Sequence, residues 1–428
     1  MRKARYLAPW RREAVDFAGR ALAADTGAGG MDAGGRERLA GRREGADRGA
    51  PEAELVAGIL EGMGGKPAIY HCVSRVVNRD FVLGREEKER FVGLMRAYER
   101  FCQVRVLTFC VMSNHFHLLL EVPAAPADGG ASWTDEKLLE HLSGLYSERE
   151  MGELRWELGH YREQKMDGAA EAFRQRFFAR MWDLSAFMKV LKQRFTQWFN
   201  KKHERDGHLW SGRFKSVLVE DGHAARTVAA YIDLNPVRAG MVSDPKDYRW
   251  SGYGEAVAGK EPAREGLRLV LFEKLSCLMN EKAAAGRVAS WREVVRLYRV
   301  GLFEDGGDRG EHEHEQGERG KRREGGDGPG GERARQGERG RRCGGITREG
   351  AARVLAEGGE LSEGELVRCR ARYFVDGLVI GSEGFVNGVY ALSREHFGTA
   401  RRSGARKLRR VRTALRTMRD LQKDAVSA

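Results

Sequence analysis

The chain has few cysteines and few prolines, and it lacks any long apolar run. Its six cysteines show no Cys-x-x-Cys spacing, which argues against a zinc ribbon or a disulfide framework and favours a reducing compartment. No apolar stretch approaches the roughly 18 residues of a membrane span, and the first residues lack the apolar segment of a signal peptide. We therefore predict a cytoplasmic protein with no membrane partner.

Two catalytic signatures are also missing. The chain has no Gly-x-x-x-x-Gly-Lys-Ser/Thr phosphate loop, which argues against a replication or conjugation initiator that carries a helicase region. A metal hydrolase typically has a His-Glu-x-x-His motif or a carboxylate-rich set of metal ligands, and neither is present near His115.

Positive charge is in excess. The 428 residues include 75 Lys and Arg against 62 Asp and Glu, which gives a formal net charge of +13 and a pI of about 9.5. A polyanion is the partner that such a surplus favours, and nucleic acid is the commonest one. The hydrophobic content of 41% permits at least one core, whereas 55 glycines and 32% charged residues indicate that much of the chain lies outside it.

Composition divides the chain into five segments. Residues 1–65 and 304–345 are rich in Gly, Arg and Glu with little periodicity, so we predict a largely disordered N-terminal arm and a disordered linker. Residues 66–255 form the main domain, with a helical insertion at about 123–172, and residues 256–303 a helical extension. The last segment, 346–428, predicts a small, basic, mostly helical C-terminal domain that ends in an arginine-rich helix.

Hydrophobic periodicity within the main domain predicts an α+β fold. Strands are expected at 68–76, 104–111, 115–122 and 213–219, and helices at 85–102, 173–202 and 227–234. Pro236 is expected to end the last helix, because it cannot donate a backbone N–H. The order strand, helix, strand, strand, helix, strand, helix fits a ferredoxin-like antiparallel sheet with helices on one face.

The most informative motif is His115-Phe116-His117, which lies in an apolar, β-rich stretch. Residues two apart on a strand face the same way, with Cα atoms about 6–7 Å apart, so the two imidazoles can share a metal ion. A pair of hydrogen-bonded core histidines is the alternative for so short a pattern.

A second candidate element contains Tyr231 and Asn235, which are four apart on a predicted helix and so lie on one face. A phenol nucleophile and an amide oxygen on one face suit a site whose other half is the histidine pair. A buried tyrosine followed by an Asn cap at the C-terminal end of the helix is the alternative.

Together these segments resemble single-tyrosine HUH transposases, in particular REP-associated tyrosine transposases and other insertion-sequence-200-like proteins. The resemblance covers about 66–255 and implies the HUH nuclease fold. It rests on four blocks in the same order, namely 70–75 (YHCVSR), 112–119 (MSNHFHLL), 207–215 (GHLWSGRFK) and 231–240 (YIDLNPVRAG). Residues 373–382 also look like the tail of some longer relatives.

The resemblance implies a DNA transposase that acts on single-stranded or hairpin DNA. Tyr231 would be the nucleophile of a metal-assisted transesterification that leaves a 5′-phosphotyrosine link and a free 3′-hydroxyl. The metal ligands would be His115, His117 and Asn235, and this mixed nitrogen and oxygen set fits Mg²⁺ or Mn²⁺. Dimers are common in the family, so we expect a homodimer, and the tyrosine can come from either copy.

Basic residues near these blocks are candidates for DNA binding. Arg213 and Lys215 lie beside aromatic residues, where cations can meet phosphates while rings stack on bases, although Trp210 fits the core better. Arg238 follows the tyrosine helix and is expected to contact phosphate. His71 is expected to pack or to support the site rather than to ligate the metal.

A domesticated protein that binds a DNA or RNA hairpin without cutting it is the alternative function. The substitution Tyr231→Phe separates the two hypotheses, because a pure binder would keep all of its activity.

Overall fold

The fold is given by a computed structural model that describes residues 67–272, 275, 290–303, 358–368, 370–394, 401–418 and 426–427. The predicted N-terminal arm (1–65) and linker (304–345) lie outside the described residues. None of the described helices is both long enough and apolar enough to cross a membrane.

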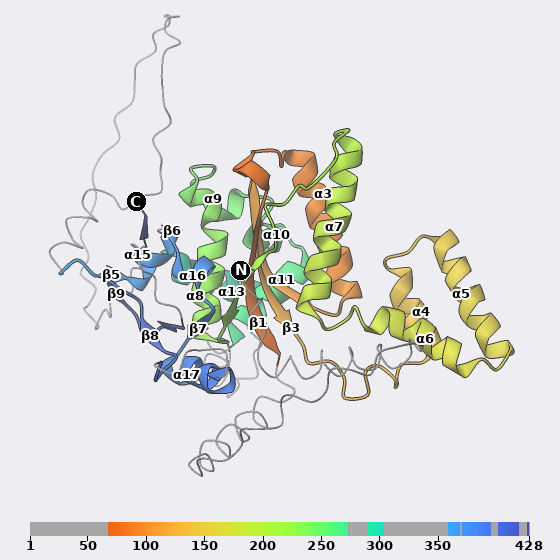
Figure 1. Cartoon of the computed structure of the whole chain (residues 1–428). Coiled ribbons are helices and arrows are strands. Elements are labelled where there is room, and N and C mark those ends of the chain that lie inside the picture. Colours follow the sequence, from red (N-terminus) through yellow and green to blue (C-terminus); the bar gives the residue numbers. More distant parts are fainter. Residues whose placement is uncertain are drawn as a thin grey trace, which may run out of the picture.

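A mixed β-sheet forms the centre of the molecule, and its strands come from both ends of the described chain (Figure 1). Over the described residues the strand order is β2 (Arg105–Val111), β3 (His115–Val122), β1 (Ala68–Arg75), β4 (Lys215–Val219), β7 (Val379–Gly381), β10 (Arg416–Thr417) and β8 (Arg406–Lys407). The first four strands pair antiparallel, and β4 and β7 run parallel. The predicted α+β class is confirmed.

Helices cover both faces of the sheet, so the prediction of helices on one face is wrong. Tyr70 and Cys72 of β1 point into one hydrophobic core, and Ile69 points into the other. The first core is covered by α3 (Arg85–Phe101) and α7 (Leu184–Lys202). The second is covered by α8 (His223–Asp233), α10 (Gly252–Val257), α11 (Glu261–Val270) and α13 (Trp291–Phe303). Nearly every residue of β2 and β3 is buried, which is typical of strands covered on both sides.

The predicted order of strands and helices is confirmed, with two differences at helix ends. The helix expected at 173–202 is divided, because α6 (Asp167–Phe178) ends before α7 begins. Pro236 does not stop the chain from turning helically. It lies in the first turn of α9 (Asn235–Arg238), where its missing N–H costs nothing because that group would have no partner within the helix. The 3-10 helix η2 (Pro245–Asp247) follows further along the chain.

The predicted insertion is helical and forms a lobe beside the end of α7 (Figure 1). Its helices are α4 (Asp135–Ser143), α5 (Glu148–Glu163) and α6. The buried Arg174 of α6 holds the lobe together, because its guanidinium pairs with Asp135 at 2.6 Å and donates to the Trp133 carbonyl at 2.7 Å.

The C-terminal segment is not mostly helical, because it adds β7, β10 and β8 to the central sheet. Its helices are α15 (Glu363–Arg368), α16 (Tyr373–Asp376) and α17 (Glu383–Leu392), and its remaining strands are β5 (Leu361–Ser362), β6 (Arg370–Ala371), β9 (Val411–Arg412) and β11 (Val426–Ser427). The arginine-rich helix predicted near the end is wrong for residues 401–418, which form short strands. Phe374 and Ile380 are fully buried in the core that α8 also covers, so this segment packs directly beside α8, the helix that carries Tyr231.

Candidate active site

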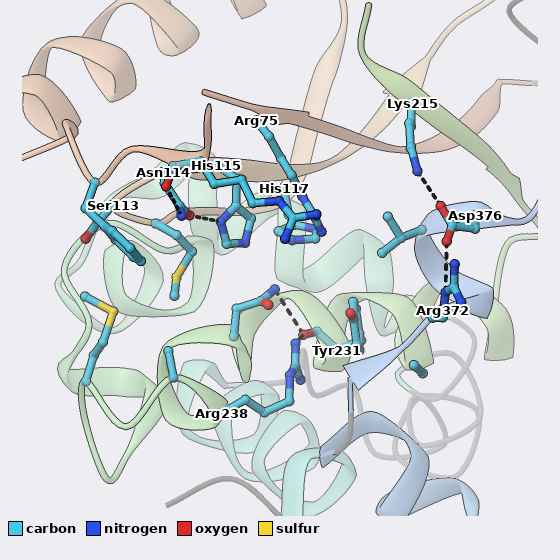
Figure 2. A pocket seen from close by; sticks show the side chains of 18 residues that line it. Arg75, Ser113, Asn114, His115, His117, Lys215, Tyr231, Arg238, Arg372 and Asp376 are labelled. Atoms are coloured by element: carbon cyan, nitrogen blue, oxygen red, sulfur yellow. Dashed lines mark hydrogen bonds and ion pairs between the residues drawn. The ribbon is translucent and has the colours of Figure 1, made fainter. Parts of the chain in front are cut away.

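A pocket of about 750 Å³ opens where the ends of β1 and β3 face α8 and α9 (Figure 2). Six of the seven predicted site residues line it, namely His115, His117, Lys215, Tyr231, Asn235 and Arg238. Arg213 is exposed and is not among the lining residues. The structure thus brings together residues that the sequence places more than a hundred positions apart.

The period of the strand explains why both histidines reach this pocket. His115 is the first residue of β3, and it lies opposite Arg75 of β1, while His117 lies opposite Val73. Phe116 between them is fully buried in the core on the other face. Because side chains alternate along the strand, both imidazoles lie on the face of the sheet that α8 covers, with ring centroids 5.2 Å apart.

A chain of hydrogen bonds fixes which nitrogen of His117 carries a proton. The Phe374 carbonyl can only accept, so His71 Nδ1, at 2.7 Å, carries a proton. A neutral His71 then has its lone pair on Nε2, which accepts a hydrogen bond from His117 Nδ1 at 2.8 Å. The lone pair of His117 is therefore on Nε2.

Burial keeps the imidazoles of His71 and His117 neutral. His71 is fully buried, and burial lowers its pKa to about 4 despite the hydrogen bond to Phe374. Burial also lowers the pKa of His117 well below its usual range, and the neighbouring His71, His115 and Arg238 add to the effect. Near neutral pH the pocket thus presents an uncharged imidazole, which is the form that binds metal.

His115 is held in the same tautomer by a different partner. Asn114 donates from its amide nitrogen to the Arg79 carbonyl at 3.0 Å, which fixes its orientation and makes its oxygen the acceptor for His115 Nδ1 at 2.6 Å. The lone pair of His115 is therefore also on Nε2. Each of the two histidines is oriented through Nδ1 by an outer partner, as is typical of metal-ligating histidines.

Tyr231 lies across the pocket from the histidines and is only 5% exposed. Its ring centroid is 6.1 Å from that of His117 and 4.6 Å from that of Phe374. The guanidinium of Arg238 lies 4.1 Å from the Tyr231 ring centroid, and it donates to the carbonyls of Tyr231 and Val367, each at 2.6 Å. Arg238 is thus a buried support for the tyrosine rather than an exposed cation.

Asn235 both caps α8 and lines the pocket. Its amide nitrogen donates to the Ile232 carbonyl at 3.1 Å and to the Tyr231 carbonyl at 3.4 Å, which is the capping role considered from the sequence. Its oxygen is the atom that can face a metal. In the described residues no group of three or more His, Cys, Asp and Glu side chains could hold a metal ion. A third protein ligand here would therefore be a neutral group such as this amide.

The C-terminal segment supplies pocket residues that sequence reasoning missed. Arg372 and Asp376 line the pocket, and Asp376 forms ion pairs with Lys215 and with Arg372. Burial acts to raise the pKa of the Asp376 carboxyl, but the bond to Lys215 keeps the pKa below its usual value. The likeness of residues 373–382 to family tails was the only signal in the sequence, and it did not place the segment beside Tyr231.

Comparison with known proteins supports the family resemblance. Residues 66–127 match the family described as "Transposase IS200 like", and this segment contains His71, His115 and His117. The predicted relation to these transposases is confirmed over that segment, which ends before Tyr231. No curated protein matches the chain. A solved structure described as a REP-associated tyrosine transposase bound to a REP hairpin aligns with 45% of this chain and 81% of its own, at 15% identity and a TM-score of 0.30.

Proposed function

We propose that this protein, whose residues 66–127 are an IS200-like transposase segment, is a DNA transposase that cuts and rejoins single-stranded DNA through Tyr231. The observation that carries the proposal is the meeting of Tyr231 with His115 and His117 in one pocket of one chain. Strand cleavage needs a nucleophile, an activated phosphate and a way to retain the energy of the broken bond. The pocket offers a residue for each need.

The reaction is a transesterification at a backbone phosphate. The Tyr231 oxygen attacks phosphorus, a bond forms between them, and the bond from phosphorus to the 3′ oxygen breaks. The 5′ end stays on the protein as a phosphotyrosine, and the 3′ end leaves as a hydroxyl. The phenol gives up one proton and the leaving oxygen takes one, so the bond energy is kept and a later 3′-hydroxyl can reseal the strand without ATP.

The donor set of the pocket fits a divalent ion. Nε2 of His115, Nε2 of His117 and the amide oxygen of Asn235 would hold it, because Asn114 and His71 fix both imidazoles in the ligating tautomer. A bound Mg²⁺ or Mn²⁺ would polarise a non-bridging phosphate oxygen and orient the phosphate toward the tyrosine. These neutral ligands imply weak metal binding that improves when a phosphate is present.

Arg238 positions the nucleophile. Its guanidinium stacks on the Tyr231 ring and bonds to the Tyr231 carbonyl, so ring and backbone are held by one side chain. Phe374 packs against the ring as well, so two side chains restrict the orientation of the phenol. Such preorganisation reduces the entropy that must be lost before attack.

We propose single-stranded or hairpin DNA as the substrate. The similar solved protein is described as bound to a REP hairpin, and the present chain carries a net charge of +13 and pocket cations at Arg75, Arg79 and Arg372. The tyrosine lies beside the histidines of its own chain, which supports attack in cis. The homodimer stays a prediction.

A covalent-capture experiment tests the proposal. Full-length protein is mixed with labelled single-stranded oligonucleotides that contain hairpins from the DNA beside its own gene, with Mn²⁺ or Mg²⁺, and run on a denaturing gel. We expect a shifted band that chelator abolishes and that Tyr231→Phe and His117→Ala both lose. The control Tyr161→Phe changes a phenol in the lobe that makes only a 3.4 Å bond to Glu157, and it should keep the band.

The alternative function gives a different result in the same experiment. A domesticated hairpin-binding protein would bind the oligonucleotides in a native gel and never form the covalent band with any divalent ion. That outcome would replace the transposase proposal.

A further inference from the structure

Two arginines of the active-site pocket also line a second cavity of about 400 Å³. The second cavity is lined by Arg75, Val76, Asn78, Arg79 and Ser211, and both arginines also line the active-site pocket. We propose that Arg75 and Arg79 each bind one of the DNA backbone phosphates next to the scissile phosphate, and that the strand passes between them from one cavity to the other. This inference rests on the proposed function and adds a binding site to it.

The first argument is that the two arginines are exposed and available to a ligand. Both are exposed, and in the described part of the chain neither guanidinium takes part in an ion pair or a hydrogen bond. The other cations of the pocket are engaged, since Lys215 pairs with Asp376 and Arg238 bonds to two carbonyls. A planar guanidinium that has no internal anion matches a phosphate with two parallel hydrogen bonds.

The position of Arg75 is the second argument. It is the last residue of β1, and it lies directly opposite His115 in the antiparallel pair with β3. Its side chain extends toward His117 in Figure 2. A phosphate bound at Arg75 would therefore lie beside the one held between the histidines and Tyr231.

The backbone around Arg79 is the third argument. Asn78 and Arg79 lie in the 3-10 helix η1 (Val77–Arg79). Their backbone φ angles are 57° and 63°, which residues other than glycine rarely adopt. The strained turn is held by Asn114, which accepts from the Val76 N–H at 2.9 Å and donates to the Arg79 carbonyl at 3.0 Å. The same Asn114 orients His115, so the arginine and the metal ligand are positioned together.

The salt dependence of DNA binding tests this site. The full-length Tyr231→Phe protein is titrated with a fluorescent single strand at several salt concentrations. Each phosphate contact contributes about 0.7 to the slope of log K against log[salt] for single strands. We expect Arg75→Gln and Arg79→Asn each to reduce the magnitude of that slope by about 0.7, and the double variant by about 1.4. Asn is chosen at position 79 because it tolerates a positive φ.

Matched variants and a parallel assay make the result decisive. Arg149→Ala removes an equal charge from an arginine of α5 whose side chain is 90% exposed, and it should leave the slope unchanged. The inference fails if the double variant, with an unchanged melting temperature, keeps the parent slope. If that happens while the wild-type protein still forms the covalent band, only the phosphate site is wrong. A parent that binds no single-stranded DNA would overturn the proposed function as well.

Discussion

Replacing His71 with leucine removes both hydrogen bonds of the chain that leads from the Phe374 carbonyl to His117. His71 is fully buried, and the change leaves two buried polar groups without partners, the Phe374 carbonyl and the His117 Nδ1–H. Each orphaned group costs about 1–3 kcal/mol of folding stability. The change also frees the His117 ring to rotate or to exchange its tautomer, so Nε2 no longer points reliably into the pocket.

The larger expected effect is on metal binding. Loss of an outer partner of a ligating histidine weakens metal affinity by about 10–100-fold, equivalent to about 1.4–2.8 kcal/mol. We expect His71→Leu to raise the Mn²⁺ dissociation constant by that factor, measured by calorimetry on the Tyr231→Phe protein with single-stranded DNA present. His71→Gln should restore most of the affinity, because its amide can both donate to Phe374 and accept from His117.

His141 provides the matched control. It is a partly buried histidine in the lobe, and its Nε2 bonds to the Phe101 carbonyl at 3.0 Å, away from the pocket. His141→Leu should cost less stability, because it leaves one carbonyl without its partner rather than two buried groups, and it should leave Mn²⁺ affinity unchanged. The reasoning is refuted if His71→Leu binds Mn²⁺ as tightly as the parent, because His71 would then serve packing alone.

Three further predictions follow from other contacts. Tyr231→Phe should abolish the covalent band and leave DNA binding within about twofold, as read in native gels, since ring packing on Phe374 is kept. Asp376→Asn should release Lys215 for phosphate and steepen the salt slope of single-strand binding by about 0.7; an unchanged slope would contradict this. Burial raises the pKa of the Asp233 carboxyl from 3.8 to about 7, despite hydrogen bonds from Tyr298, the Tyr253 N–H and Thr108. Because the folded state holds this proton more tightly than the unfolded state, stability should fall between about pH 4 and pH 7 by up to about 4 kcal/mol. The stability of Asp233→Asn, measured by urea unfolding at several pH values, should lack that decline. If the stability of both proteins falls with pH in the same way, Asp233 is not the cause.

The parts of the site that could be predicted are those set by local periodicity. His115 and His117 share a face because a strand repeats every two residues, and Tyr231 and Asn235 reach one pocket because residues four apart lie on one side of helical turns. Hydrophobic periodicity was enough to place these elements. Their order along the chain predicted the antiparallel sheet.

The parts that failed depend on contacts between distant segments. Arg372 and Asp376 reach the pocket, and Phe374 reaches the Tyr231 ring, only because α16 packs against β1 and β4, and no local pattern encodes that docking. Arg238 was expected at phosphate, yet the same docking buries it against the Val367 carbonyl. The roles of Arg213 and Lys215 in DNA binding stay predictions.

The C-terminal helix failed for a related reason. Leu408, Val411 and Leu415 are spaced as in a helix, and together with the many arginines they favour one. All three are buried, but they come from short strands and turns that pack on the core shared with α8. Tertiary burial has overridden the local pattern here.

The measurement that tests the account most directly is the mapping of the protein–DNA adduct by mass spectrometry. Wild-type protein is captured on a single-stranded hairpin oligonucleotide with Mn²⁺, digested with protease and nuclease, and sequenced. The account predicts a nucleotide linked through a 5′ phosphate to the peptide that contains Tyr231, and no adduct when the metal is chelated. An adduct on any other residue, or one that persists in Tyr231→Phe, would contradict it.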